Sequence, residues 1–363
     1  LVTALGYKTP AEQAGGWTGG YVSQAIKLDL LDNMKEPFDD KAAIMMLHNA
    51  LFVKPMDIVS LTELKPADEI ALTKFHNIYY EKDIVYAIEN INLDGGLSVK
   101  ESEVRIGNKV LYDPDSIAAG YIGQRVEYYY KNDSDDTLIL AKPMKGEDVV
   151  NIAAGNIEDV NVSGNQITVK YSEGRSARTV STSADAVVVY NGQMLVPPYQ
   201  KNDFDIDSGS LKFMSVNKNG YNVLFVYAYD TYVVNSVDVH NEKVYAKYRP
   251  DALDLSKSNV PKYEITKNIG GKVISLDNLK EWDVLSVLKK HPSQEKGPLK
   301  ISLTAKKVTG IVEAVYEDGV TIGGKDYEIS DSFKPYASGL LLSDTDRLGK
   351  KITVYLGLSG EIV

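Results

Sequence analysis

Three carboxylates stand two residues apart in the segment 203–207, which reads DFDID. In a β-strand alternate residues point to the same side, so we expect the three acids on one face and the two apolar residues on the opposite, inward face. Three like charges in a row need water or a cation between them, and carboxylate oxygens suit calcium. The segment departs from an EF-hand loop, which needs a glycine where Ser208 stands. The pattern predicts either an exposed strand face or a calcium site formed by Asp203, Asp205 and Asp207.

The sequence has no pattern typical of a catalytic centre. Its four histidines do not include a metal-binding His-x-x-x-His pair, and the Gly-x-Ser-x-Gly turn of serine hydrolases is absent. The lack of cysteine excludes thiol nucleophiles, disulfides and zinc–thiolate sites. A glycosidase with paired carboxylates is a minority alternative. We therefore expect that the protein is not an enzyme.

Composition narrows the classes of partner. The net charge of −10 opposes binding to nucleic acid or to an anionic membrane, and no apolar run is long enough for a membrane-spanning helix, so neither nucleic acid nor membrane insertion is expected. The first residue, Leu1, follows no initiator methionine or leader, which is typical of a processed or truncated chain. The 24 tyrosines against 7 phenylalanines favour half-exposed strands and interfaces.

A locally basic segment lies at 289–307. Runs of this kind are usually solvated surface; as a binding site it would fit an anionic wall polymer or an acidic neighbouring copy, because it lacks aromatic residues that stack on nucleotides. Its cations are Lys289, Lys290, Lys296, Lys300, Lys306 and Lys307.

The predicted secondary structure changes from helices to strands along the chain. Apolar residues at helical spacing predict helices up to about residue 55, with Asp39 or Asp40 capping the last of them, and Pro66 predicts a further helix up to Phe75. From about residue 76, short β-branched or aromatic runs alternate with turn dipeptides such as Asn191-Gly192, which indicates consecutive hairpins. The fold class predicted is α+β, predominantly antiparallel β.

An internal repeat is also indicated. The segments 104–129 and 320–355 each contain a hairpin, a looser connection and a closing strand that follows an apolar-Gly-polar-basic turn. We therefore expect small β-barrel or β-sandwich modules. The expected parts are a helical segment at 1–55, a helical linker at 56–75, and β modules at 76–133, 134–235, 236–307 and 308–363, the last repeating the first.

The first 55 residues resemble the second half of an S-layer homology region, found in cell-surface proteins of Gram-positive, clostridial-type bacteria. The matching stretches are Leu1-Val2-Thr3-Ala4-Leu5-Gly6-Tyr7, Gly15-Gly16-Trp17-Thr18-Gly19-Gly20-Tyr21, Leu28-Asp29-Leu30-Leu31 and Met45-Met46-Leu47-His48-Asn49-Ala50-Leu51. The resemblance implies an extracellular, wall-associated protein with polymer-binding residues Trp17, Tyr21 and Lys41. The family usually has a Thr-Arg pair where this chain has Asp39 and Asp40, and two carboxylates would repel an anionic polymer; the helices would then serve as an assembly surface.

Together these features predict a secreted, non-catalytic structural protein of the cell surface that associates with copies of itself and with cell-wall polysaccharide. The alternative is a carbohydrate-binding or adhesive module, such as part of a virion.

Overall fold

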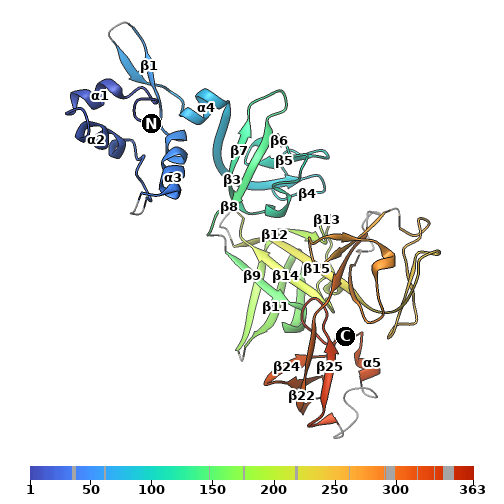
Figure 1. Cartoon of the computed structure of the whole chain (residues 1–363). Helices are drawn as coiled ribbons and strands as arrows, with labels where there is room; N and C mark the ends of the chain where they lie inside the picture. Colours follow the sequence, from blue (N-terminus) through green and yellow to red (C-terminus); the bar gives the residue numbers. More distant parts are fainter. Residues whose placement is uncertain are drawn as a thin grey trace. The chain divides into compact units, whose positions relative to one another are not determined.

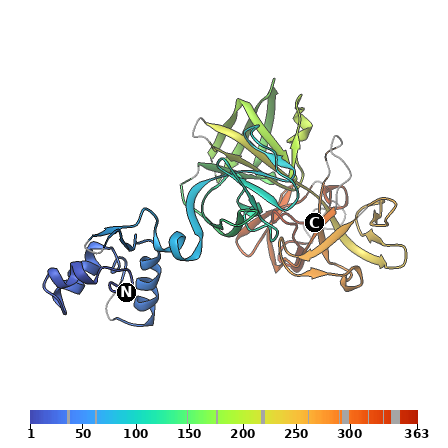
Figure 2. The same ribbon diagram turned by 90° about the horizontal axis from the view of Figure 1, so that it is seen from above.

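The structure is a computed structural model, and it describes residues 1–34, 38–60, 63–146, 148–174, 176–216, 220–260, 262–289, 291, 299–316, 318–330, 332–337 and 347–363. Strands account for 46% of the chain and helices for 15%, and most strand pairs are antiparallel. Figures 1 and 2 show strands through most of the chain, with the helices mainly in its N-terminal part. This confirms the predicted fold class. The chain forms two compact units, one of Leu1–Glu89 with Leu97–Lys145 and one of Asn90–Gly96 with Gly146–Val363. Among the described residues no helix is long and apolar enough to cross a membrane.

The first unit begins with a helical part. Its elements are α1 (Lys8–Gln13), α2 (Gly19–Lys27), α3 (Asp40–Leu51), β1 (Met56–Ile58), β2 (Leu64–Pro66) and α4 (Ala71–His76). Residues 1–7, which fall within the range predicted to be helical, form turns instead. The expected helical linker at 56–75 is also different, because β1 and β2 pair antiparallel before α4 starts. The helices enclose a small core that includes Val2, Leu5, Ala25, Leu30 and Val53.

Local sequence explains where α3 begins. The Asp39 carboxylate accepts a hydrogen bond of 2.9 Å from the backbone N–H of Ala42, so this side chain is the predicted N-cap. The helix buries Ala42 and Ala50, whereas Leu47 is exposed. An apolar residue is therefore left on the outer side of α3.

The rest of the first unit is a small β-barrel. Its strands are β3 (Ile78–Ile88), β5 (Glu103–Ile106), β6 (Lys109–Tyr112), β7 (Arg125–Lys131) and β8 (Thr137–Pro143). The sheet runs β3-β5-β6-β8-β7 and closes because β3 also pairs with β7. The barrel extends beyond the expected boundary at 133, since β8 pairs with β7 along its length.

The second unit contains one large sheet. Its strands are β9 (Val149–Ala153), β10 (Ile157–Ser163), β11 (Gln166–Glu173), β12 (Ser176–Tyr190), β13 (Gln193–Leu195), β14 (Gly209–Met214), β15 (Tyr221–Asp238), β16 (Lys243–Ala246), β17 (Leu253–Asp254), β18 (Tyr263–Lys267), β19 (Val273–Ile274), β20 (Val284–Leu288) and β21 (Leu299–Thr304). The short strand β4 (Ile91–Asn92) also belongs to the second unit but not to this sheet. Strand β15 pairs with β12, β14, β16 and β20. It crosses the expected boundary between residues 235 and 236, because its last residues pair with β16 as far as Asp238. Separate buried clusters lie along its first and second halves.

A four-stranded sheet completes the second unit. It consists of β22 (Lys307–Val315), β23 (Gly319–Ile322), β24 (Lys325–Glu328) and β25 (Lys351–Tyr355), with the short helix α5 (Lys334–Ala337). Its strand β22 pairs with both β23 and β25, as β3 does with β5 and β7.

The two segments that resemble each other in sequence also share their pairing. The backbone of Val85 donates to Gln124 at 3.0 Å and accepts from Gly123 at 2.8 Å. At the corresponding place, Val312 donates to Lys350 at 3.0 Å and accepts from Gly349 at 2.9 Å. The register of the strand pair then shifts in both copies just after this valine. The likeness therefore extends to a specific irregularity of the sheet.

Candidate functional site

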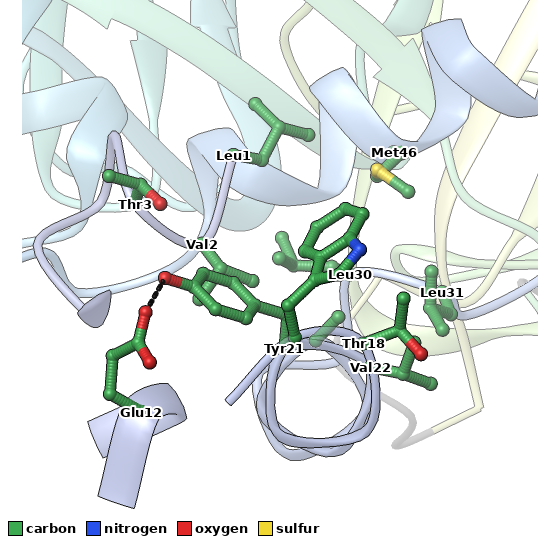
Figure 3. Close-up of a pocket in the computed structure, with 12 residues that line it drawn as sticks. Leu1, Val2, Thr3, Glu12, Thr18, Tyr21, Val22, Leu30, Leu31 and Met46 are labelled. Atoms are coloured by element: carbon green, nitrogen blue, oxygen red, sulfur yellow. Dashed lines mark hydrogen bonds between the residues drawn. The ribbon is translucent and has the colours of Figure 1, made fainter. Parts of the chain in front are cut away.

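A groove of about 520 Å³ lies in the helical part of the first unit (Figure 3). Its lining is mostly apolar and comes from the N-terminal turns, α1, α2, the turn after α2, and α3. The lining residues are Leu1, Val2, Thr3, Glu12, Trp17, Thr18, Tyr21, Val22, Ala25, Leu30, Leu31 and Met46.

Trp17 is the most exposed aromatic residue of the groove, with 84% of its surface accessible. It lies in the turn between α1 and α2, where Gly16 has a φ of +64°. Gly20, in the first turn of α2, approaches α1 so closely that a Cβ would collide with the carbonyl oxygen of Ala11. This close approach fixes the turn, and the turn presents the indole to solvent.

Tyr21 follows Trp17 by four residues and forms the second aromatic wall. The ring centroids of the two residues are 5.8 Å apart at an angle of 62°, an edge-to-face arrangement. The Tyr21 hydroxyl donates a hydrogen bond of 2.8 Å to Oε1 of Glu12, shown by the dashed line in Figure 3. That bond raises the pKa of Tyr21 above its ordinary value. The phenol therefore stays neutral and is held in place by the acid.

The charge of the groove differs from that of an anion site. Glu12 is the only carboxylic acid among the described lining residues, and no lysine or arginine is found there. Lys41 is exposed in the first turn of α3 and is not part of the lining, so the structure brings Trp17 and Tyr21 together without it. The lining suits an uncharged ligand with an apolar face.

The predicted strand at 203–207 is wrong. Residues Lys201–Asp203 form a short 3-10 helix, because the backbone N–H of Gln200 donates to the Asp203 carboxylate at 2.7 Å in a capping box. Asp203 also bonds Nε2 of His291 at 2.9 Å. The expected alternation survives in an irregular backbone, with Phe204 and Ile206 buried.

Calcium binding at Asp203, Asp205 and Asp207 stays a prediction. The first of these carboxylates already has two partners, which an ion would have to replace or share. Within the described ranges, no group of three or more His, Asp or Glu residues could hold a metal ion.

The basic segment is described only in part. Lys290 and Lys296 lie outside the described residues, while Lys289, Lys300 and Lys306 are exposed. Binding of an anionic polymer to this segment stays a prediction.

Sequence reasoning missed Glu12 and Met46 as members of the groove. Glu12 lies on a separate helix nine residues before Tyr21, and the four glycines between 15 and 20 are the only sequence signal that the two helices fold back on each other. The position of Met46 depends on how α3 packs, which local sequence does not specify.

Comparison of the chain with models of known protein families, with curated proteins and with solved structures found no match. The functional argument therefore rests on the residues of this chain and their arrangement.

Proposed function

We propose that the protein is a non-catalytic cell-surface protein that attaches to envelope polysaccharide through the groove of Trp17 and Tyr21 and associates with copies of itself. The observation that carries this proposal is the exposed indole of Trp17 beside a phenol that Glu12 holds in place. An aromatic ring has a negative face, which attracts the slightly positive C–H groups on the flat side of a sugar. Covering roughly 100 Å² of such surface contributes about 2.5 kcal/mol, at about 25 cal/mol per Å².

The expected ligand is a neutral segment of the polysaccharide. An anionic segment would meet the carboxylates of Glu12 in the groove and of Asp39 and Asp40 at the start of α3. The cation that directly follows these two aspartates in the sequence is Lys41. Repulsion by the carboxylates would weaken the binding of such a segment. Sugar hydroxyls can instead bond the Glu12 carboxylate and the Thr18 hydroxyl that lines the groove.

The placement at the cell surface rests on the resemblance of residues 1–55 to an S-layer homology region. The β modules that follow would extend from the attached helices and present sheet edges and tyrosines to neighbouring copies. This proposal includes secretion of the protein and an extracellular location.

Self-association is supported by apolar side chains on the outer faces of two helices. Three of them lie outside the groove and expose more than half of their surface: Ile26 on α2, and Ile44 and Leu47 on α3. Large exposed apolar patches typically mark interaction sites, because their burial against a partner is favourable. A second copy of the chain would bury these residues without the need for a charged partner.

The groove can be tested through its own tryptophan, because the chain has two tryptophans and the other is Trp282. In the full-length Trp282→Phe variant, Trp17 is the sole indole. Adding neutral polysaccharide purified from a Gram-positive cell wall should shift its emission to shorter wavelength as sugar covers the ring. The Trp17→Phe variant is the control and should show no such shift. No response of Trp17 at saturating polysaccharide would contradict attachment through this groove.

Self-association needs a separate measurement. Sedimentation velocity over a range of concentrations should show larger species, and Ile44→Glu should remove them by placing a charge on the outer face of α3. Lys41→Glu, at another exposed position of the same helix, is the control for added negative charge. Polysaccharide binding by a protein that stays monomeric would favour the alternative of a carbohydrate-binding or adhesive module.

A further inference from the structure

We propose that a second groove, in the second unit, binds a sugar that carries a negative charge on a carboxylate or a phosphate. This groove has a volume of about 390 Å³. It lies where the loop before β20 meets the last four-stranded sheet, and its aromatic and polar lining includes Tyr248, Trp282, Phe333, Arg347, Thr353 and Tyr355. The inference does not depend on the groove of Trp17.

Aromatic rings form the walls of this groove. Trp282 and Tyr355 are stacked, with their centroids 5.4 Å apart and their planes 14° from parallel. The ring centroids of Tyr248 and Phe333 are 4.7 Å apart. Trp282 nevertheless keeps 39% of its surface exposed, so the wall is open to a ligand. A hollow with aromatic walls and a few polar groups is the usual form of a small-ligand site.

Backbone and side-chain contacts hold Trp282 in its position. The backbone φ of Trp282 is +71°, which is unusual for a residue with a side chain. The backbone N–H of Trp282 donates a hydrogen bond of 2.9 Å to the carbonyl of Val234. The ammonium of Lys247 lies 4.0 Å from the centre of the indole ring and pairs with Glu281 at 2.6 Å. Disfavoured backbone conformations persist where the surrounding structure requires them, and such places are often functional.

Arg347 supplies the charge. It is the only lysine, arginine, aspartate or glutamate among the described lining residues, and its guanidinium has no ion pair or hydrogen bond within the described part of the chain. The ammonium of Lys247 is already balanced by Glu281. A carboxylate or phosphate on the ligand would match the fork of N–H donors that a guanidinium presents.

A smaller pocket adjoins the groove and provides a polar end. Tyr248 and Phe333 line both, and the small pocket has a volume of about 10 Å³, close to that of one water molecule. Thr231 lines it, and the Thr231 hydroxyl oxygen is buried with no hydrogen-bond partner in the described structure. A sugar hydroxyl, or a water that bridges to it, would satisfy this group.

These features together favour a sugar over a purely apolar ligand. An apolar ligand would cover Arg347 without pairing it, which is unfavourable for a charged group. A charged sugar offers apolar C–H groups for the aromatic wall of Trp282 and Tyr355, an anion for Arg347, and hydroxyls for Thr353 and, through a bridging water, for Thr231.

The full-length Trp17→Phe variant tests the proposal, since Trp282 is then the sole tryptophan. Its fluorescence should change with trigalacturonate or with glucose 6-phosphate, and the stronger of the two ligands identifies the anion. Neutral galactotriose should bind about tenfold or more weakly, because it lacks a partner for the guanidinium. An equal response to the neutral and charged sugars, or no response to any of them, would overturn the proposal.

Adding Arg347→Gln to this variant should weaken the binding of the charged sugar by about tenfold to a hundredfold and leave the neutral sugar unaffected. Arg178→Gln is the matched control: Arg178 lies on β12 of the same unit, pairs with Glu173, and should not affect binding. Equal losses in the two arginine variants would contradict the role of Arg347. Because Trp17 is absent from all these proteins, the result is independent of the first groove.

Discussion

The hydroxyl of Ser208 donates a hydrogen bond of 2.8 Å to Oε1 of Glu361 and joins two segments that are 153 residues apart in the chain. Beside it, the N–H of Gly209 donates to the Ser359 hydroxyl at 2.9 Å. The other carboxylate oxygen of Glu361 is buried and has no partner among the described residues. Burial raises the pKa of this carboxyl above its ordinary value of 4.5.

The first prediction concerns Glu361→Gln and pH. A raised pKa in the folded state means that the neutral acid stabilises the fold below about pH 4.5, and that this contribution is lost as pH rises through the raised value. The glutamine variant stays neutral, so at pH 7 its free energy of unfolding should exceed that of the unmodified protein by about 1–2 kcal/mol. The difference should vanish toward pH 4.

Urea unfolding at several pH values between 4 and 7 measures this difference. Glu264→Gln, an exposed residue of β18 in the same unit, should show no pH-dependent gain. A Glu361→Gln variant that is less stable than the unmodified protein at pH 7 would contradict the prediction.

A second prediction concerns Gly209 at the start of β14. Its φ is +120°, and a Cβ at this position would collide with the carbonyl oxygen of Tyr227. Gly209→Ala should therefore lower the free energy of unfolding by about 1–3 kcal/mol. Gly164→Ala separates strain from collision, because Gly164 has a φ of +62° but open space around it, and should cost about 1 kcal/mol. Urea unfolding measures both losses as shifts of the midpoint, provided that the dependence of the free energy on urea concentration is unchanged. Equal losses in the two variants would show that the collision at Gly209 is absent.

A third prediction concerns the barrel of the first unit. Glu81 accepts hydrogen bonds from the hydroxyls of Tyr128 at 2.8 Å and Tyr130 at 3.0 Å, and both tyrosines are buried. Glu81→Ala would leave two phenol hydroxyls without their acceptor, which should destabilise the unit by about 1–3 kcal/mol. Glu81→Gln keeps an acceptor oxygen and should lose less, while the exposed Glu101→Ala should be neutral. Thermal unfolding followed by tyrosine circular dichroism distinguishes these outcomes, and an unaffected Glu81→Ala barrel would refute the role of the acid.

A fourth prediction compares the two tryptophans in the absence of ligand. Trp17 is 84% exposed and Trp282 is 39% exposed and stacked on Tyr355. The Trp282→Phe protein, which reports Trp17, should emit at longer wavelength and be quenched more strongly by acrylamide than the Trp17→Phe protein. The opposite order would mean that the indole of Trp17 is covered.

Local sequence predicted the structure correctly where neighbouring residues determine the backbone conformation. Asn191 and Gly192 have φ values of +48° and +83° between β12 and β13, as the predicted two-residue hairpin requires. The Asp39 cap and the alternating burial around Phe204 also follow from neighbouring residues.

Local sequence did not predict the structure correctly where contacts between distant segments determine it. The strand expected at Asp203 is replaced by a 3-10 helix that Gln200 caps, with His291 bonded to the same acid from 88 residues away. Strand β15 pairs with β12 and β20 before the expected boundary and with β16 beyond it, so one strand belongs to both expected modules. The resemblance to an S-layer homology region implied Trp17, Tyr21 and Lys41 as one set, but only Trp17 and Tyr21 line the groove, because the position of Lys41 depends on the packing of α3.

Attachment to the envelope can be measured by sedimenting the full-length protein with purified Gram-positive cell walls. The unmodified protein should sediment with the walls, and Trp17→Ala should remain in solution because the groove has lost its exposed ring. Phe75→Ala removes another exposed aromatic residue of the first unit, on α4, and should sediment normally. Equal sedimentation of Trp17→Ala and the unmodified protein, or no sedimentation of either, would contradict attachment through the groove of Trp17 and Tyr21.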